Sequence, residues 1–226
     1  MHIEPGVVEG AKMALGAVTA TGALALTAKL ARDFVAENGV AVLAARTVVT
    51  TALVFSFFQI FPHHPVGVSE VHMILGSTLF LLFGAPAAMI GLASGLLIQG
   101  LFFAPADLPQ YGINVTTLLV PLYAMSLLAK RIIPAATAYR DVTYKQALAL
   151  SVAFQGGIVS WVAFWALYGQ GLGAENLAQV ASFGAAYMLV ILLEPLVDLA
   201  VLAVAKNAHR LTGGQLFAKR LHTAAA

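Results

Sequence analysis

Seven apolar runs, separated by short polar stretches, account for most of this chain. Most of them approach or exceed the length of about 20 residues that a helix needs to cross the hydrocarbon core of a bilayer. The third run is shorter than the others and stops at Gly84-Ala85-Pro86. The pattern therefore predicts an all-α bundle of about seven transmembrane helices. The runs cover residues 7–30, 40–61, 72–83, 87–103, 113–129, 147–168 and 177–205.

The breaks between the runs carry proline, glycine and charge. A Pro-His-His-Pro stretch ends the second run, since proline resists continuation of a helix. We also expect a polar break at residues 32–39 and a long polar stretch at residues 130–145. No break is long enough to hold a separate soluble domain. The chain is therefore predicted to be a single transmembrane domain over residues 1–226, which includes a basic tail at residues 206–226.

Composition supports a membrane protein. Hydrophobic residues make up 60% of the 226 residues and charged residues only 10%, against about 25% charged residues in a soluble domain. There are no cysteines, which excludes disulfides, thiolate metal ligands and thiol catalysis, so that any metal site must use nitrogen or oxygen. The N-terminus carries Glu4 and Glu9 instead of the basic segment of a signal peptide, and we interpret it as uncleaved.

The basic residues predict the orientation of the bundle, because cytoplasmic loops of membrane proteins are enriched in Lys and Arg. With seven spans and the N-terminus outside, the outer loops at residues 62–71, 104–112 and 169–176 contain no Lys or Arg. Of the 12 basic residues only Lys12 then lies near the outer face. We therefore expect the N-terminus outside and the C-terminus in the cytoplasm. The distribution reports topology, and it does not indicate binding of nucleic acid.

The first two residues offer three nitrogens to one metal ion. The α-amine of Met1, the amide nitrogen of His2 and the imidazole Nδ1 of His2 can surround an ion in one plane, and they leave a fourth position for another imidazole. A planar nitrogen set favours Ni(II) or Cu(II), and can hold Co(II), over Zn(II), which prefers a tetrahedron. A second histidine, His72, opens the third apolar run. Taken alone, a histidine at position 2 more often has no function.

Further motifs accompany these two histidines. The chain starts Met-His-Ile with Gly6 close behind, and a loop over residues 67–72 ends in His72. Later motifs are Leu75-Gly76, Gly84-Ala85-Pro86, Leu97-Ile98-Gln99-Gly100-Leu101-Phe102-Phe103 and Gly112-Ile113-Asn114-Val115. In order and spacing over residues 1–6 and 62–130, the motifs resemble the CbiM/NikM family, the cobalt/nickel-binding substrate-specificity (S) subunits of energy-coupling factor (ECF) transporters. The last third of the chain is similar only in hydropathy.

The resemblance implies that residues 1–6 form a metal-binding strap. In the family, the metal is held by nitrogens that correspond here to the amine of Met1, the amide and ring of His2, and the ring of His72. The chain departs from the family where a proline separates the acidic residue of the strap from its glycine, and where Glu70 replaces a small residue. Residues around the ligands tune the choice of metal, so cobalt versus nickel stays open. The residues predicted to surround the ligands are Glu4, Ser69, Glu70 and Asn114.

The resemblance also implies a function. Family members are the substrate-binding subunits of ATP-driven importers for Co2+ or Ni2+ in the bacterial cytoplasmic (inner) membrane, and cobalt would serve cobalamin biosynthesis. The expected partners are a transmembrane coupling subunit, ABC ATPase subunits and membrane lipid. The chain has no Gly-x-x-x-x-Gly-Lys-Ser/Thr phosphate loop, so we do not expect it to be an enzyme that hydrolyses ATP. In the predicted orientation the metal is captured on the outer face.

Two other classes of function remain open. A stand-alone secondary divalent-metal permease or channel would need polar groups along the whole path of the metal through the membrane, or broken helices at mid-membrane. In this chain the groups able to bind a metal gather at the outer end, which favours capture over conduction. Dependence of transport on ATP and partner subunits would distinguish an importer subunit from a permease or channel. An intramembrane hydrolase has less support, because His-Glu-x-x-His and Gly-x-Ser-x-Gly are absent.

Four other polar residues have no assigned role. His63 and His64 are either ligands for incoming metal or solvated loop histidines. Glu194 and Asp198 lie four residues apart on one face of the seventh run, and carboxylates inside a membrane are costly and often functional. They either contact the coupling subunit or pair with Arg46 across the bundle.

Overall fold

A computed structural model describes residues 3–135 and 137–207 of the chain. Most of these residues are helical and form seven α-helices, which confirms the predicted all-α class. They also form one small antiparallel sheet of two strands, β1 (His64–Val66) and β2 (Ser69–Val71). The helices are α1 (Met13–Asn38), α2 (Val40–Gln59), α3 (Gly76–Phe83), α4 (Ala85–Phe102), α5 (Tyr111–Ile132), α6 (Tyr144–Gln170) and α7 (Ala174–Asn207).

Six helices within the described ranges are long and apolar enough to cross a membrane. The helix that falls short is α3, whose 8 residues rise about 12 Å, against about 30 Å for the hydrocarbon core. The third predicted run thus forms a helix but only part of a crossing. The prediction of a multi-pass membrane protein is confirmed.

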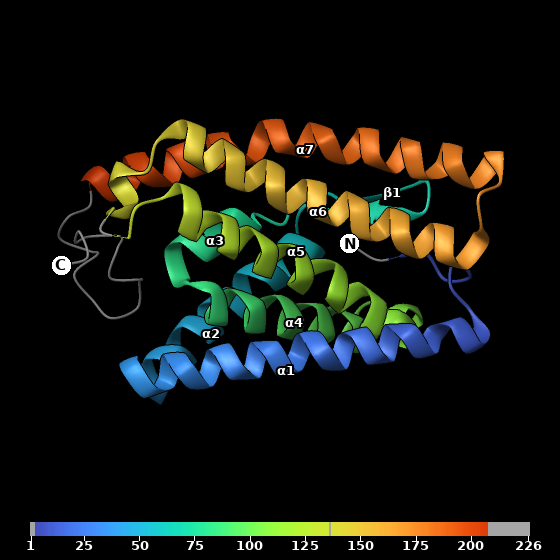
Figure 1. Cartoon of the computed structure of the whole chain (residues 1–226), viewed down its shortest axis with the longest axis horizontal. Coiled ribbons are helices and arrows are strands. Elements are labelled where there is room, and N and C mark those ends of the chain that lie inside the picture. Colours follow the sequence, from blue (N-terminus) through green and yellow to red (C-terminus); the bar gives the residue numbers. More distant parts are fainter. Residues whose placement is uncertain (1–2, 136, 208–226) are drawn as a thin grey trace.

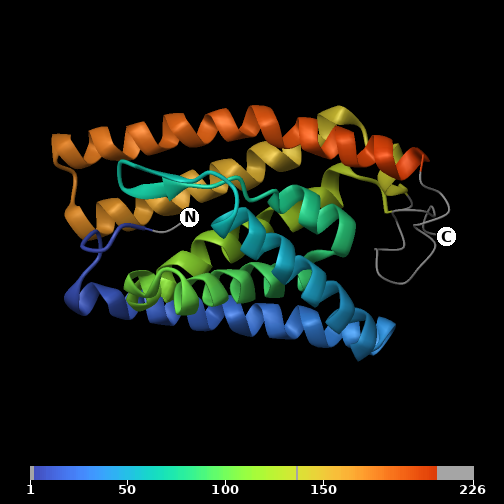
Figure 2. The ribbon, with the colours of Figure 1, turned by 180° about the vertical axis from the view of Figure 1, so that it is seen from behind.

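The helices run back and forth along the long axis of the molecule (Figure 1). In both views α1 and α7 lie on opposite sides of the bundle (Figures 1 and 2). The start of α1 and the turn from α6 to α7 lie at one end of the bundle, and the turn from α1 to α2 and the end of α7 lie at the other (Figure 1). Buried apolar side chains of the described residues form one cluster between the helices.

Small residues let α2 and α4 approach closely. A Cβ atom added at Gly91 would lie 2.4 Å from Thr50 Oγ1, and one added at Gly95 would lie 2.6 Å from Val54 Cγ1. The Thr50 hydroxyl also donates to the carbonyl of Ala87 at 2.8 Å. In lipid, where apolar burial does not drive helices together, such close contacts and hydrogen bonds hold them. The packing keeps α2, and hence the start of the loop that follows it, against the bundle.

The predicted bounds of the first and third runs are wrong. The first helix continues through the expected polar break and ends only before Gly39, which has a φ of 84°. Lys29 and Asp33 pair at 3.0 Å on the exposed side of α1, so the helix accommodates these charges one turn apart. The third helix starts at Gly76, and His72 lies in the irregular segment before it.

The loop between α2 and α3 contains the two strands, which the sequence analysis did not predict. Gly67 stands in the tight turn with a φ of 62°, a conformation that glycine adopts without strain. The strands pair His64 with Val71 and Val66 with Ser69. Valines on both sides of a glycine are a hairpin signal that the dominant helical pattern obscured. This β-hairpin packs against α7.

Candidate metal-binding site

The N-terminal segment is docked against the β-hairpin and α5. Ile3 forms an antiparallel bridge with Ser69, and its backbone N–H donates to Asn114 Oδ1 at 2.9 Å. The N–H of Glu4 donates to the carbonyl of Val68 at 3.2 Å. These bonds add a short stretch of N-terminal chain to the hairpin, and they leave Ile3 only 1% exposed.

Met1 and His2, two of the predicted ligands, lie outside the described residues. The prediction that their amine, amide and ring nitrogens bind a metal therefore stays a prediction. Ile3 follows His2 directly in the chain, and its bonds fix the described end of the strap. That end lies against the hairpin that leads to His72.

His72 follows β2 and precedes α3 in the chain, and it is fully buried. Its Nε2 lies 2.9 Å from Glu70 Oε2. An ionised carboxylate can only accept a hydrogen bond, so the proton of the imidazole is on Nε2 and, in a neutral ring, the lone pair is on Nδ1. A carboxylate on the far nitrogen is the common support of a metal-binding histidine, because it fixes the tautomer and orients the ring. The arrangement makes Nδ1 of His72 competent to bind a metal.

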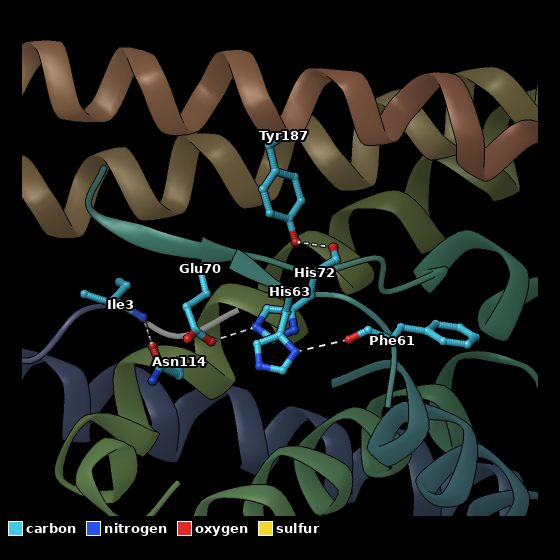
Figure 3. Close-up of polar contacts among 7 residues, drawn as sticks. All are labelled: Ile3, Phe61, His63, Glu70, His72, Asn114 and Tyr187. Atoms are coloured by element: carbon cyan, nitrogen blue, oxygen red, sulfur yellow. Dashed lines mark hydrogen bonds and ion pairs between the residues drawn. The ribbon is translucent and has the colours of Figure 1, made fainter. Parts of the chain in front are cut away.

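Two aromatic rings set the plane of the His72 ring. Phe58 meets it edge-on with 5.1 Å between the ring centroids, and His63 stacks on it at 4.9 Å with 13° between the ring planes (Figure 3). The Nδ1 of His63 donates to the carbonyl of Phe61 at 3.1 Å, so in a neutral ring the lone pair is on Nε2. His63 is therefore part of the surroundings of His72, whereas His64 is exposed on β1.

The backbone of His72 is held by α7. The hydroxyl of Tyr187, which is fully buried, donates to the carbonyl of His72 at 3.1 Å (Figure 3). Sequence analysis missed Tyr187 because it stands in an apolar run without a motif, 115 residues from its partner. A polar-tipped aromatic residue in such a run is a weak signal, since a buried hydroxyl usually needs a partner.

Acidic side chains lie around the docked strap. Burial raises the pKa of the Glu4 carboxyl, and the charges of Glu70 and Asp107 raise it further. Glu70 and Asp107 therefore repel the charge of Glu4, and a cation bound beside Glu4 would relieve the repulsion. The local field favours a positively charged ligand.

The described residues predicted for the site lie together. Ile3 contacts Ser69 and Asn114, Glu4 lies in the electrostatic field of Glu70, and Glu70 contacts His72. Within residues 3–135 and 137–207, however, no three His, Asp or Glu side chains are placed so that they could hold a metal ion. The described residues thus offer one oriented imidazole, and a complete coordination sphere needs further donors.

Glu194 does not pair with Arg46, which was one of its two predicted roles. It is fully buried and accepts hydrogen bonds from side chains of α3 and α6. Arg46 instead donates to the carbonyl of Phe83 at 3.3 Å. The predicted pairing of Glu194 with Arg46 is therefore wrong, and the side chain of Asp198 lies outside the described part of the chain.

Comparison with known protein families confirms the resemblance seen in the motifs. The family model CbiM, described as the cobalt uptake substrate-specific transmembrane region, matches residues 2–211. Comparison with curated proteins and with solved structures gives no match. The matched range takes in residues 2–6 of the strap, the hairpin, the segment with His72 and the helices from α1 to α7. The chain therefore belongs to the CbiM family, and it is a multi-pass membrane component of metal uptake.

Proposed function

We propose that this chain is the substrate-binding subunit of an ATP-driven importer for Co2+ or Ni2+. Cobalt is the first candidate, because the family is described by cobalt uptake. One ion is bound by the amine of Met1, the amide and ring nitrogens of His2, and Nδ1 of His72. The residues that keep these ligands in place are Glu4, Ser69, Glu70 and Asn114.

The docking of Ile3 is the observation that carries this proposal. Its bonds to Ser69 and Asn114 join the strap to the hairpin whose second strand leads into His72. A metal site shared between residue 2 and His72 requires the N-terminal strap to lie beside the segment that carries His72. The docking of Ile3 supports such a site. The carboxylate on Nε2 of His72 adds support, because it directs the other nitrogen of the ring to a ligand.

The proposed orientation has the strap and the start of α1 outside and the end of α7 in the cytoplasm. The absence of Lys and Arg from residues 62–71, 104–112 and 169–176 supports it. Metal is then captured on the outer face. Energy comes from ABC ATPase subunits through a transmembrane coupling subunit, since the chain lacks a phosphate loop of its own.

Metal binding by purified protein that starts at Met1 tests the site. Affinity and stoichiometry for Co2+ and Ni2+ are measured for the unchanged protein, for His2→Ala, for His72→Ala and for a form with one residue added before Met1. We expect equimolar binding that all three changes abolish. Unchanged binding by the extended form would mean that the terminal amine is not a ligand and that the proposed site is wrong.

Uptake of Co2+ by cells separates an ATP-driven subunit from a stand-alone permease. Cells that produce this chain together with its coupling and ATPase subunits are compared with cells whose ATPase subunits are inactivated. We expect uptake only in the first. Equal uptake in both would favour the permease.

Labelling of introduced cysteines tests the orientation, because the chain has no cysteine of its own. Gly173→Cys stands in the turn between α6 and α7, where an added Cβ atom meets nothing within 4 Å. Ala36→Cys is exposed near the other end of α1. In whole cells, a maleimide that cannot cross membranes is expected to label the first and not the second. The reverse result would overturn the orientation.

A further inference from the structure

Helix α7 holds both ends of the segment that runs from His72 to Ser77. The hydroxyl of Tyr187 donates to the carbonyl of His72 at 3.1 Å. Two turns further along α7, Glu194 Oε1 accepts from the backbone N–H of Ser77 at 3.2 Å. We call Tyr187 and Glu194 the α7 anchors. Both side chains are fully buried, so water does not compete for either hydrogen bond.

The Glu194 carboxylate joins three helices. Its Oε1 accepts from the Ser77 hydroxyl at 2.8 Å as well as from the Ser77 N–H. Its Oε2 accepts from the Ser151 hydroxyl at 3.1 Å and from the Gln155 amide, both on α6. The Ser77 N–H belongs to the first turn of α3, where the helix dipole favours a negative group. The carboxylate thus fixes the start of α3 against α6 and α7.

The segment between the anchors has little structure of its own. Residues 72–75 belong to no helix or strand. Leu75 has a φ of 53° and a ψ of 40°, a left-handed conformation that residues other than glycine seldom adopt. Gly76 lies against α6, where an added Cβ atom would be 2.2 Å from Phe154 Cε1. Such a backbone persists only where its surroundings over-determine it, and the α7 anchors are part of those surroundings.

The hairpin before His72 rests on the same helix. A Cβ atom added at Gly67, in the turn, would lie 2.1 Å from the carbonyl oxygen of Gln179. From the hairpin turn to the start of α3, the chain that carries His72 therefore follows α7 at three successive places. A change in the position of α7 acts on His72 directly.

We infer that the α7 anchors are positioning residues for His72. They offer no ligand to the metal, but they fix the backbone from which the imidazole extends. The ligands of a metal site must be held within about 0.5 Å of the binding geometry, so a loosened segment loses metal affinity. The inference rests on the proposed function, in which His72 is a ligand.

Variants of the anchors test the inference in the full-length protein. Tyr187→Phe removes the hydroxyl that bonds to His72, and Glu194→Gln removes the charge. Tyr111→Phe is the matched control, because it removes a hydroxyl that donates to the carbonyl of Ala93 at 3.0 Å, on other helices. In a competition titration we expect each anchor variant to weaken Co2+ binding about tenfold or more, and the control to leave it unchanged. Equal effects of Tyr187→Phe and Tyr111→Phe would overturn the inference.

A spectrum separates positioning from a general loss of stability. The absorption of bound Co2+ reports its ligand set, so at saturating metal the spectra of the anchor variants are expected to differ from those of the unchanged protein and of Tyr111→Phe. A purely structural role would lower the melting temperature of the metal-free protein and leave the spectrum of the loaded protein unchanged. That second pattern would also overturn the inference.

The His72→Ala variant distinguishes failure of the inference from failure of the proposed site. If His72→Ala leaves Co2+ binding unchanged, the proposed site is wrong and the inference falls with it. If His72→Ala weakens binding and Tyr187→Phe behaves as the control does, the site stands and the inference alone is wrong. Should Glu194→Gln not fold, Tyr187→Phe decides the result, because it keeps the aromatic ring and leaves the hydrogen bonds of Glu194 unchanged.

Discussion

Replacing Asn114 by leucine tests how much the docked strap contributes to metal binding. Leucine has the same branching and the same number of side-chain heavy atoms but no acceptor, so the N–H of Ile3 loses the bond of 2.9 Å that it makes to Asn114 Oδ1. Both residues are 1% exposed. Water therefore cannot replace the lost acceptor unless the strap undocks.

The size of the effect follows from the burial of that N–H group. A buried donor left without a partner costs about 1–3 kcal/mol. Among the described residues, two longer bonds of the strap remain, from the Glu4 N–H to Val68 at 3.2 Å and from the Gln110 amide to the carbonyl of Glu4 at 3.3 Å. If the strap undocks in the metal-free variant and must dock again to bind, Co2+ affinity falls by about 5- to 150-fold, the equivalent of that free energy.

A competition titration with purified protein measures the Co2+ affinity of Asn114→Leu. The control is Ser126→Ala, which removes a hydroxyl on the same helix that donates to the carbonyl of Tyr123 at 2.7 Å. Melting of the metal-free proteins shows that each variant is folded. Equal affinities of Asn114→Leu and Ser126→Ala, in an assay where His72→Ala weakens binding, would refute the reasoning.

Three other substitutions have defined outcomes. Glu70→Gln is expected to weaken Co2+ binding about 10- to 100-fold in the same titration, because it neutralises the carboxylate that lies 2.9 Å from His72 Nε2. His63→Ala is expected to change Co2+ affinity far less than His72→Ala, because rings with centroids 4.9 Å apart and planes 13° apart cannot direct their lone pairs at one ion. Gly91→Ala is expected to lower the free energy of unfolding in detergent by about 1–3 kcal/mol, because its Cβ atom would lie 2.9 Å from the backbone carbonyl carbon of Thr50.

Each of these has a result that would contradict it. An unchanged affinity of Glu70→Gln would mean that the carboxylate does not support the histidine ring. A loss in His63→Ala as large as that in His72→Ala would make His63 a ligand. For the glycine, Gly22→Ala is the control, since an added Cβ atom there meets nothing within 4 Å; equal losses in the two variants would rule out the contact between α2 and α4 as the cause.

Much of the candidate site was predictable because its residues stand in short motifs. Glu70 and His72 are two residues apart, so their proximity is a local matter. The roles of Ser69 and Asn114 as neighbours of the strap came from the resemblance to a family, and the structure brings both to Ile3. The ligand roles of the first two residues stay predictions.

By itself, the sequence determined the class of the protein and the number and order of its helices. Lipid offers no partners to backbone N–H and C=O groups, so a long apolar run in a membrane must be helical, whatever it packs against. The predicted break within α1 was wrong because Lys29 and Asp33 pair along the helix surface, and charged residues of this kind do not stop a helix.

Only the tertiary structure decided which distant residues meet. Ile3 and Asn114 are 111 residues apart, Tyr187 and His72 are 115 apart, and Ser77 and Glu194 are 117 apart. Hydrophobic periodicity says which face of a helix is apolar, but it does not say which neighbour that face will find. These partners depend on how the helices pack, because a buried polar group must find a hydrogen-bond partner wherever the packing leaves one within reach.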